Sequence, residues 1–269
     1  MAILKLLLFS GLVAYFLLAH KVHASSGELP VRVAVAANFK PTLQSLVRAY
    51  GAQKPLVNVQ ISSASSGVLY AQILRGAPFD LFLSADSERP GLLQQQGLVA
   101  ADSLTSYALG QLVLWAPGLS SLSIENIRGF SGNIALANPE LAPFGRASMQ
   151  TLLKLGLWGG KKNKLIMANN VSQVAQMINI GAVPMGLLSK SLVKTVVKEH
   201  LWQVPDGYYQ AIVQQMVILN KAPLNAHHSQ SVRSFYQYIL SPQGQDIISQ
   251  NGYLLPTASA TTEDFTSAR

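Results

Sequence analysis

Ser62-Ser63-Ala64-Ser65-Ser66-Gly67 joins an apolar stretch at 56–61 to the run VLYAQIL at 68–74. The first stretch predicts a short strand, and the second predicts a helix. Small hydroxyl residues at such a junction place O–H donors beside the free backbone N–H groups of a helix N-terminus, and that cluster attracts anions. A polar loop that only caps the helix is the alternative for this stretch taken alone.

The same strand, junction and helix unit occurs three times before residue 100. The first unit has a strand at 31–37 and a helix that begins near Pro41, and the third has a strand at 79–83 and a helix at 87–96. Three such units predict an α/β fold with a mostly parallel sheet, in which ligands bind at the carboxyl ends of the strands. The polar residues that fall at these ends are Asn38, Ser65, Ser66 and Ser84.

A second set of units predicts a second lobe. We expect strands at 133–137, 164–168 and 184–188, and long strands at 107–117 and 208–219 that cross between the lobes as hinges. The sequence therefore predicts two lobes, each a mixed, mostly parallel sheet flanked by helices. We expect the first lobe to contain residues 28–108 and 216–256, and the second to contain residues 109–215.

The N-terminus is typical of an export signal. Lys5 precedes an apolar run at 6–18, and Val22-His23-Ala24 offers small residues for cleavage before Ser25. A membrane anchor is the alternative, although a spanning helix needs about 20 apolar residues. The chain has no cysteine, which excludes a lipidated cysteine, disulfides and thiolate metal sites. We expect a periplasmic protein without a lipid anchor, a cleaved signal peptide at 1–24 and a disordered tail at 257–269.

The charge of the chain is basic but dispersed. The formal net charge is +8, and removing residues 1–24 leaves +6 because only Lys5 and Lys21 are lost. Basic residues interleaved with aromatic ones, as in single-strand binders, are not found. We therefore expect no nucleic-acid partner and a surface field that mildly attracts anions.

Catalytic chemistry has little support in the sequence. The chain has no G-x-S-x-G elbow and no G-x-x-x-x-G-K phosphate loop. His200, His227 and His228 remain outside the expected signal, in stretches that indicate surface positions. We expect no catalytic residue, no cofactor and no bound metal cation. A serine hydrolase, which would need a histidine beside Ser66, is the alternative from another class.

What remains is a set of uncharged donors at junctions of both lobes: Asn38, Ser66, the helix starts at Phe144 and Val171, and Ser189. A cleft lined by such donors, without carboxylates, fits a fully ionised oxyanion, because that ligand offers only acceptors. Protonated phosphate carries an O–H group that needs an acceptor, so this cleft disfavours it. Another oxyanion such as sulfate or a phosphonate is the alternative, and Arg146 is the only guanidinium near a junction that would favour a phosphonate.

Several motifs resemble those of the periplasmic molybdate-binding proteins of ABC importers. They are AANF at 36–39, ASSG at 64–67, GAPFDLFLSAD at 76–86, NP at 138–139 with PFG at 143–145, and SPQGQ at 241–245. The resemblance covers about residues 31–256. It implies a type II-like periplasmic binding protein whose lobes close on molybdate, and also on tungstate, before delivery to a membrane permease. We expect a monomer that makes and breaks no bond.

The resemblance also implies a ligand set. It places anion contacts on the Asn38 and Ser66 side chains, with Ala37 and Ser65 beside them, and on the backbone N–H groups of Phe144 and Val171. Some family members have tyrosine at the position of Ser189 and others at that of Phe144, whereas this chain has a phenol at neither. The serine side chain is shorter, so we expect the Ser189 contact to be water-mediated or missing.

Overall fold

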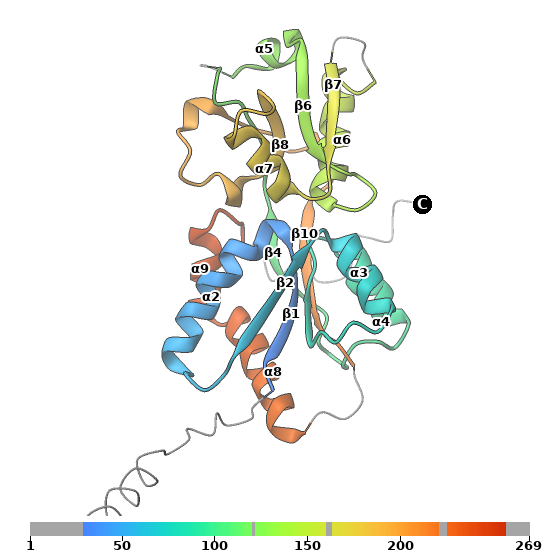
Figure 1. Ribbon diagram of the computed structural model, residues 1–269, viewed down its shortest axis with the longest axis vertical. Coiled ribbons are helices and arrows are strands. Elements are labelled where there is room, and N and C mark those ends of the chain that lie inside the picture. Colours follow the sequence, from blue (N-terminus) through green and yellow to red (C-terminus); the bar gives the residue numbers. More distant parts are fainter. Residues whose placement is uncertain (1–28, 120–121, 160–162, 221–224, 257–269) are drawn as a thin grey trace, which may run out of the picture.

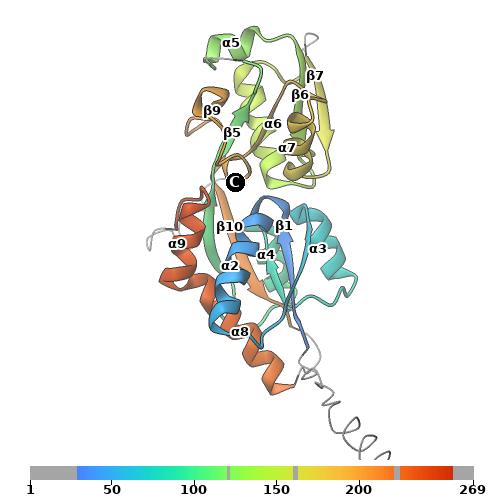
Figure 2. The ribbon, with the colours of Figure 1, turned by 60° about the vertical axis from the view of Figure 1, so that its left-hand side comes forward.

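The computed structural model describes residues 29–119, 122–159, 163–220 and 225–256. The expected signal peptide and the expected tail both lie outside these ranges. The chain forms two lobes, each built on a five-stranded sheet, with β4 and β10 running side by side toward the junction between them (Figures 1 and 2). No helix of the described ranges is long and apolar enough to cross a membrane.

The first sheet has the strand order β2-β1-β3-β10-β4. Strand β1 pairs in parallel with β2 and β3, while β10 pairs antiparallel with β3 and β4, so the sheet is mixed. The strands are β1 (Val31–Ala36), β2 (Val59–Ala64), β3 (Leu81–Leu83), β4 (Thr105–Gly110) and β10 (Ile212–Ile218).

Helices cover both faces of this sheet because alternate residues of β1 point to opposite sides. Val31, Val33 and Val35 pack in one buried cluster with residues of α2 (Lys40–Gln53), α8 (Ala226–Leu240) and α9 (Pro242–Gln250). Ala34 packs in the other, with residues of α3 (Ser66–Leu74) and α4 (Glu88–Gln95). The short helix η1 (Ala37–Phe39) leads from β1 directly into α2.

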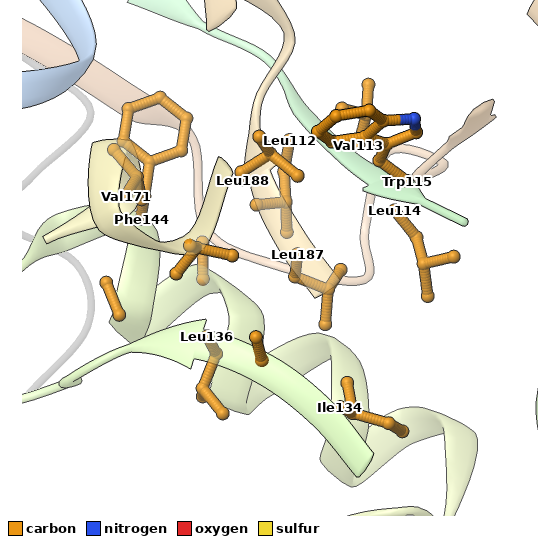
Figure 3. Packing of buried hydrophobic residues seen from close by; sticks show 14 of the residues in the cluster. Leu112, Val113, Leu114, Trp115, Ile134, Leu136, Phe144, Val171, Leu187 and Leu188 are labelled. Carbon is orange, nitrogen blue, oxygen red and sulfur yellow. The ribbon is translucent and has the colours of Figure 1, made fainter. Parts of the chain in front are cut away.

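The second sheet has the order β7-β6-β8-β5-β9 and repeats the mixed pattern. Its parallel pairs join β6 to β7 and β8, and β5 pairs antiparallel with β8 and β9. Leu112, Leu136 and Leu187 from three of these strands pack in one apolar core (Figure 3). The elements are β5 (Leu112–Trp115), α5 (Ile124–Gly129), β6 (Gly132–Ala137), α6 (Pro143–Leu155), β7 (Asn163–Ala168), α7 (Val171–Asn179), β8 (Met185–Ser189), η2 (Lys190–Leu192), η3 (Lys198–His200) and β9 (Leu201–Gln203).

The chain crosses between the lobes twice, in shorter segments than the sequence predicted. The expected strand at 107–117 is two strands, because Gln111 separates β4 of the first sheet from β5 of the second. The expected strand at 208–219 begins only at Ile212, since residues 206–209 form a turn in which Gly207 has a φ of +80°. The lobe divisions expected after residues 108 and 215 fall inside β4 and β10.

Candidate functional site

A small cavity lies between the lobes, where strands of both sheets end. Its volume is about 10 Å³, whereas pockets for organic ligands typically measure about 300–1,000 Å³. This volume holds about one water molecule, so the cavity in its closed form is far too small for an organic ligand. Its lining residues are Ala36, Ala37, Asn38, Ser65, Ser66, Ala85, Ala142, Pro143, Phe144, Asn170 and Val171.

The two serines of the central junction do not cap the helix that follows them. Strand β2 extends through Ala64, so Ser65 is the N-cap residue of α3 and Ser66 is its first residue. The Ser65 hydroxyl is buried, accepts no hydrogen bond from the helix and has no hydrogen-bond partner among the described residues. Ser66 Oγ accepts the backbone N–H of Ala85 at 2.9 Å, which leaves the Ser66 proton available to donate. The capping alternative is therefore wrong for both side chains.

Asn38 lines the cavity from η1 and is buried. Its amide nitrogen donates to Gln214 Oε1 at 2.9 Å and to the Tyr253 hydroxyl at 3.1 Å. Both amide protons are therefore used in hydrogen bonds to residues of the first lobe. The structure thus shows Asn38 holding η1 against the hinge strand β10. Ala36, Ala37 and Asn38 line this side of the cavity.

Helix α6 presents its N-terminus to the cavity without a side-chain cap. Ala142 is the N-cap residue and Pro143 has no N–H group, so Phe144 and Gly145 carry the first N–H groups of the helix. The Phe144 side chain is 1% exposed and lies beside Val171 at one end of the second core (Figure 3). A Cβ atom at Gly145 would lie only 2.3 Å from the Ala137 carbonyl oxygen, so glycine is required for this close approach.

Helix α7 is capped in a way that leaves its first N–H free. Asn170 Oδ1 accepts the N–H groups of Ser172 at 3.0 Å and Gln173 at 3.1 Å. The cap does not reach Val171, which is buried and lines the cavity. Asn170 was not among the site residues predicted from the sequence, although asparagine immediately before a helix is a common N-cap signal.

Ser189 and Ser84 lie outside the cavity lining. Ser189 is buried at the end of β8, where its hydroxyl lies 2.8 Å from the Ser191 hydroxyl. The Ser84 hydroxyl donates to Asp86 Oδ1 at 3.1 Å. The structure therefore brings together six of the residues that the sequence singled out, namely Ala37, Asn38, Ser65, Ser66, Phe144 and Val171.

The electrostatics of the cavity favour an anion without the help of a charged side chain. Three helix N-termini, those of α3, α6 and α7, meet there, and each carries about half a positive elementary charge. None of the described lining residues is acidic or basic. Arg146 lies away from the cavity and pairs with Glu88 of the first lobe at 2.8 Å. Arg146 instead lines a neighbouring pocket of about 400 Å³, so it is not one of the donors of this cavity.

Hydrogen bonds across the cleft hold the lobes together. Gly67 N–H donates to the Leu141 carbonyl at 2.9 Å, and the Ser172 hydroxyl donates to the Ala37 carbonyl at 3.1 Å. Arg89 donates to the Glu140 carbonyl at 3.1 Å. These contacts close the two lobes over the cavity and explain its small volume.

The histidine geometry does not support a hydrolase. The expected surface position is wrong for His228, which is 3% exposed because it lies on the inward face of α8. Its Nδ1 lies 3.1 Å from the Leu29 carbonyl oxygen and its Nε2 3.3 Å from Asp80 Oδ1. His200 Nδ1 lies 3.1 Å from the Leu119 carbonyl oxygen. Neither of these two rings contacts Ser66.

Comparison with known proteins adds independent findings. Residues 31–254 match the family described as bacterial extracellular solute-binding protein. The chain is 33% identical to the molybdate-binding protein ModA of Azotobacter vinelandii, over 83% of this chain and 89% of that protein. It is 30% identical to ModA of Rhodobacter capsulatus, over 86% of this chain and 90% of that protein.

A solved structure agrees with these matches. The periplasmic molybdate-binding protein of Azotobacter vinelandii superposes with a TM-score of 0.77 at 34% identity, covering 84% of this chain and all of that one. This match confirms the two-lobed periplasmic binding protein fold that the sequence predicted.

Proposed function

Because the chain belongs to the bacterial extracellular solute-binding protein family, we propose that it captures molybdate between its lobes and delivers it to the membrane permease of an ABC importer. One observation carries the proposal: the buried Ser65 hydroxyl has no partner and lies at a cavity where three helix N-termini meet. A buried hydroxyl without a partner costs about 1–3 kcal/mol. An oxyanion in the cavity would accept its hydrogen bond and remove that cost. The names of the two ModA relatives support molybdate as this oxyanion.

The donor set defines the ligand class. Molybdate is a tetrahedral dianion whose oxygens accept hydrogen bonds and donate none. The hydroxyls of Ser65 and Ser66 and the N–H groups of Phe144 and Val171 would surround it from both lobes. Tungstate has the same charge and nearly the same size, so we propose that it binds as well. Sulfate is smaller, and its hydrogen bonds to donors set for molybdate would be stretched.

Calorimetric titration tests this function directly. The wild-type protein is titrated with molybdate, tungstate, sulfate and phosphate under the same conditions. We expect molybdate and tungstate to bind at least about 100-fold more tightly than the other two anions. A protein that prefers sulfate would be a sulfate carrier, and a protein that binds none of the four would overturn the proposal.

The location and assembly of the protein are part of the proposal. We propose that the protein is exported to the periplasm, acts there as a monomer, and needs no cofactor or nucleic acid. N-terminal sequencing of the exported protein, with Ser25 expected as the first residue, tests the signal peptide. Gel filtration with light scattering tests the monomer.

Replacing Ser65 by alanine separates ligand binding from folding. We expect the affinity for molybdate to fall by about 1.5–3 kcal/mol, which is the range for a hydrogen bond to a charged group. The free energy of unfolding without ligand should be unchanged or slightly higher, because the hydroxyl has no partner in the protein. Isothermal titration and denaturant unfolding measure the two quantities. The control is Ser63→Ala, an exposed serine of β2, which should change neither. If the Ser65→Ala protein unfolded more easily but bound molybdate as tightly as the wild type, Ser65 would have a purely structural role.

Gly67→Ala tests whether the cavity works through closure of the lobes. A Cβ atom at Gly67 would lie 2.9 Å from the Leu141 carbonyl oxygen and 3.2 Å from the Leu141 Cα, both in the opposite lobe. These two contacts arise only when the lobes meet, and the remaining neighbour, Arg89 Nη2 of the first lobe at 3.1 Å, is the end of a flexible side chain. We expect molybdate affinity to fall about tenfold, while the ligand-free protein keeps its stability because alanine suits a helix better than glycine. Gly51→Ala in α2, where a Cβ meets nothing within 4 Å, is the matched control. If Gly67→Ala and Gly51→Ala bound molybdate equally well, the lobes would not close to the Gly67–Leu141 distance that the structure shows.

A further inference from the structure

Tyr253 lies behind the cavity, where the two lobes meet. Its side chain is buried and packs edge-on against Phe39, with the ring centroids 5.1 Å apart. The next residue, Leu254, forms a β-bridge with Leu109 of β4. These contacts fix the tyrosine ring to the first lobe.

The Tyr253 hydroxyl has partners in both lobes. It accepts a hydrogen bond from Asn38 Nδ2 at 3.1 Å. Its own proton has two acceptors within reach, the Asn38 carbonyl oxygen at 2.9 Å and Ser191 Oγ at 2.9 Å. Ser191 belongs to η2 of the second lobe, and its hydroxyl in turn donates to the same Asn38 carbonyl at 3.1 Å. One carbonyl of η1 is therefore held by hydroxyls from both lobes.

The neighbouring carbonyl of η1 is held in a similar way. Ser172 of α7 donates to the Ala37 carbonyl across the cleft at 3.1 Å. Ala37 and Asn38 both line the cavity, so both of these cavity residues are fixed through their carbonyls by the second lobe. Of the groups that hold them, Tyr253 is the one that joins the Asn38 side chain, the Asn38 carbonyl and the second lobe at a single atom.

The phenol remains a donor at neutral pH. Burial raises the pKa of Tyr253 to about 12, although hydrogen bonds to Ser191 and Asn38 act in the opposite direction. A neutral hydroxyl can accept from Asn38 Nδ2 and still donate to the second lobe.

We propose that Tyr253 is a positioning residue for the anion site, which holds η1 in place against Ser191 of the second lobe when the cleft is closed. Tyr253 does not line the cavity and makes no contact with the anion in this scheme. Because its hydroxyl joins the lobes, removing it should weaken the closed, liganded form more than the fold of the first lobe. The inference rests on the proposed function for the identity of the anion.

Tyr253→Phe tests the inference with Tyr236→Phe as its matched control. The Tyr236 hydroxyl also has two partners within the first lobe, Thr105 Oγ1 at 2.7 Å and the Ser103 carbonyl oxygen at 2.9 Å, but these residues do not line the cavity. We expect Tyr253→Phe to weaken molybdate binding roughly three- to tenfold, through faster dissociation in stopped-flow measurements. Tyr236→Phe should lower the thermal midpoint and leave the dissociation constant unchanged.

The same substitution in a Ser191→Ala protein gives a second test. In a Ser191→Ala protein, Tyr253→Phe should have a clearly smaller effect on the dissociation rate, because the partner in the second lobe is already gone. Unchanged molybdate binding by Tyr253→Phe, or an equal loss in Tyr236→Phe, would overturn the inference. If the wild type binds sulfate instead of molybdate, only the proposed function fails, and the same comparison is made with sulfate. If the wild type binds no oxyanion, both fail.

Discussion

Replacing Asn38 by aspartate is expected to weaken molybdate binding by at least about 100-fold. The new carboxylate would take the place of the Asn38 amide nitrogen, which now lies 2.9 Å from Gln214 Oε1, so two acceptors would face each other. The residue is only 1% exposed, so little water is available to screen the added charge. That negative charge would lie at the wall of the cavity in which we propose that a dianion binds, and the two would repel each other.

Asn38→Ala is the comparison that isolates the charge. It removes the two hydrogen bonds from Nδ2 but leaves the Asn38 carbonyl and its partners in place. We expect an affinity loss of roughly tenfold, since each lost hydrogen bond is worth about 0.5–1.5 kcal/mol. Isothermal titration of both variants with molybdate measures the difference. Equal affinities would mean that η1 does not face the anion.

Gly145→Ala is expected to damage both the fold and the site. The new Cβ would lie 2.3 Å from the Ala137 carbonyl oxygen and 2.8 Å from the Asn138 carbonyl carbon and oxygen, and all three are backbone atoms that no side-chain rotation can move away. The N-terminus of α6 would have to shift and would carry the Phe144 N–H with it. We expect the free energy of unfolding to fall by about 3 kcal/mol and molybdate binding to be lost.

The control for this prediction is another glycine in a first helical turn. Gly91 lies in α4, and a Cβ there would meet nothing within 4 Å. Gly91→Ala should therefore raise the free energy of unfolding by up to about 1 kcal/mol through helix propensity alone. Denaturant unfolding of both variants, with molybdate titration of each, checks the result. A Gly145→Ala protein as stable as the wild type would show that α6 can move without cost.

The sequence predicted the two-lobed fold well because its signals are local. Each strand, junction and helix unit is one buried strand followed by polar residues and an amphipathic run, and each can be recognised within about 30 residues. The lobe divisions were less well predicted because the crossing segments are apolar on both sides of Gln111. Periodicity in such a segment does not show where one sheet ends and the next begins.

The candidate site was predictable where helix N-termini form it. Ser65, Ser66, Phe144 and Val171 stand at helix starts that the sequence indicates, and the structure brings them to one cavity. The partners that hold the site were not predictable. Tyr253 lies 215 positions from Asn38 in the chain, and the two meet only because the C-terminal segment returns to β4. A hydrogen bond of that sequence separation leaves no local pattern.

The position of β10 in the first sheet has a consequence for how this protein is made. This strand, Ile212–Ile218, lies between β3 and β4, and both of those strands are synthesised more than a hundred residues earlier. A nascent chain shorter than about 212 residues therefore lacks the strand that joins β3 to β4 in the first sheet. Contacts between segments so far apart form slowly. The first lobe thus cannot complete its sheet until almost all of the chain has been translated, whereas all five strands of the second sheet, between Leu112 and Gln203, are synthesised before β10.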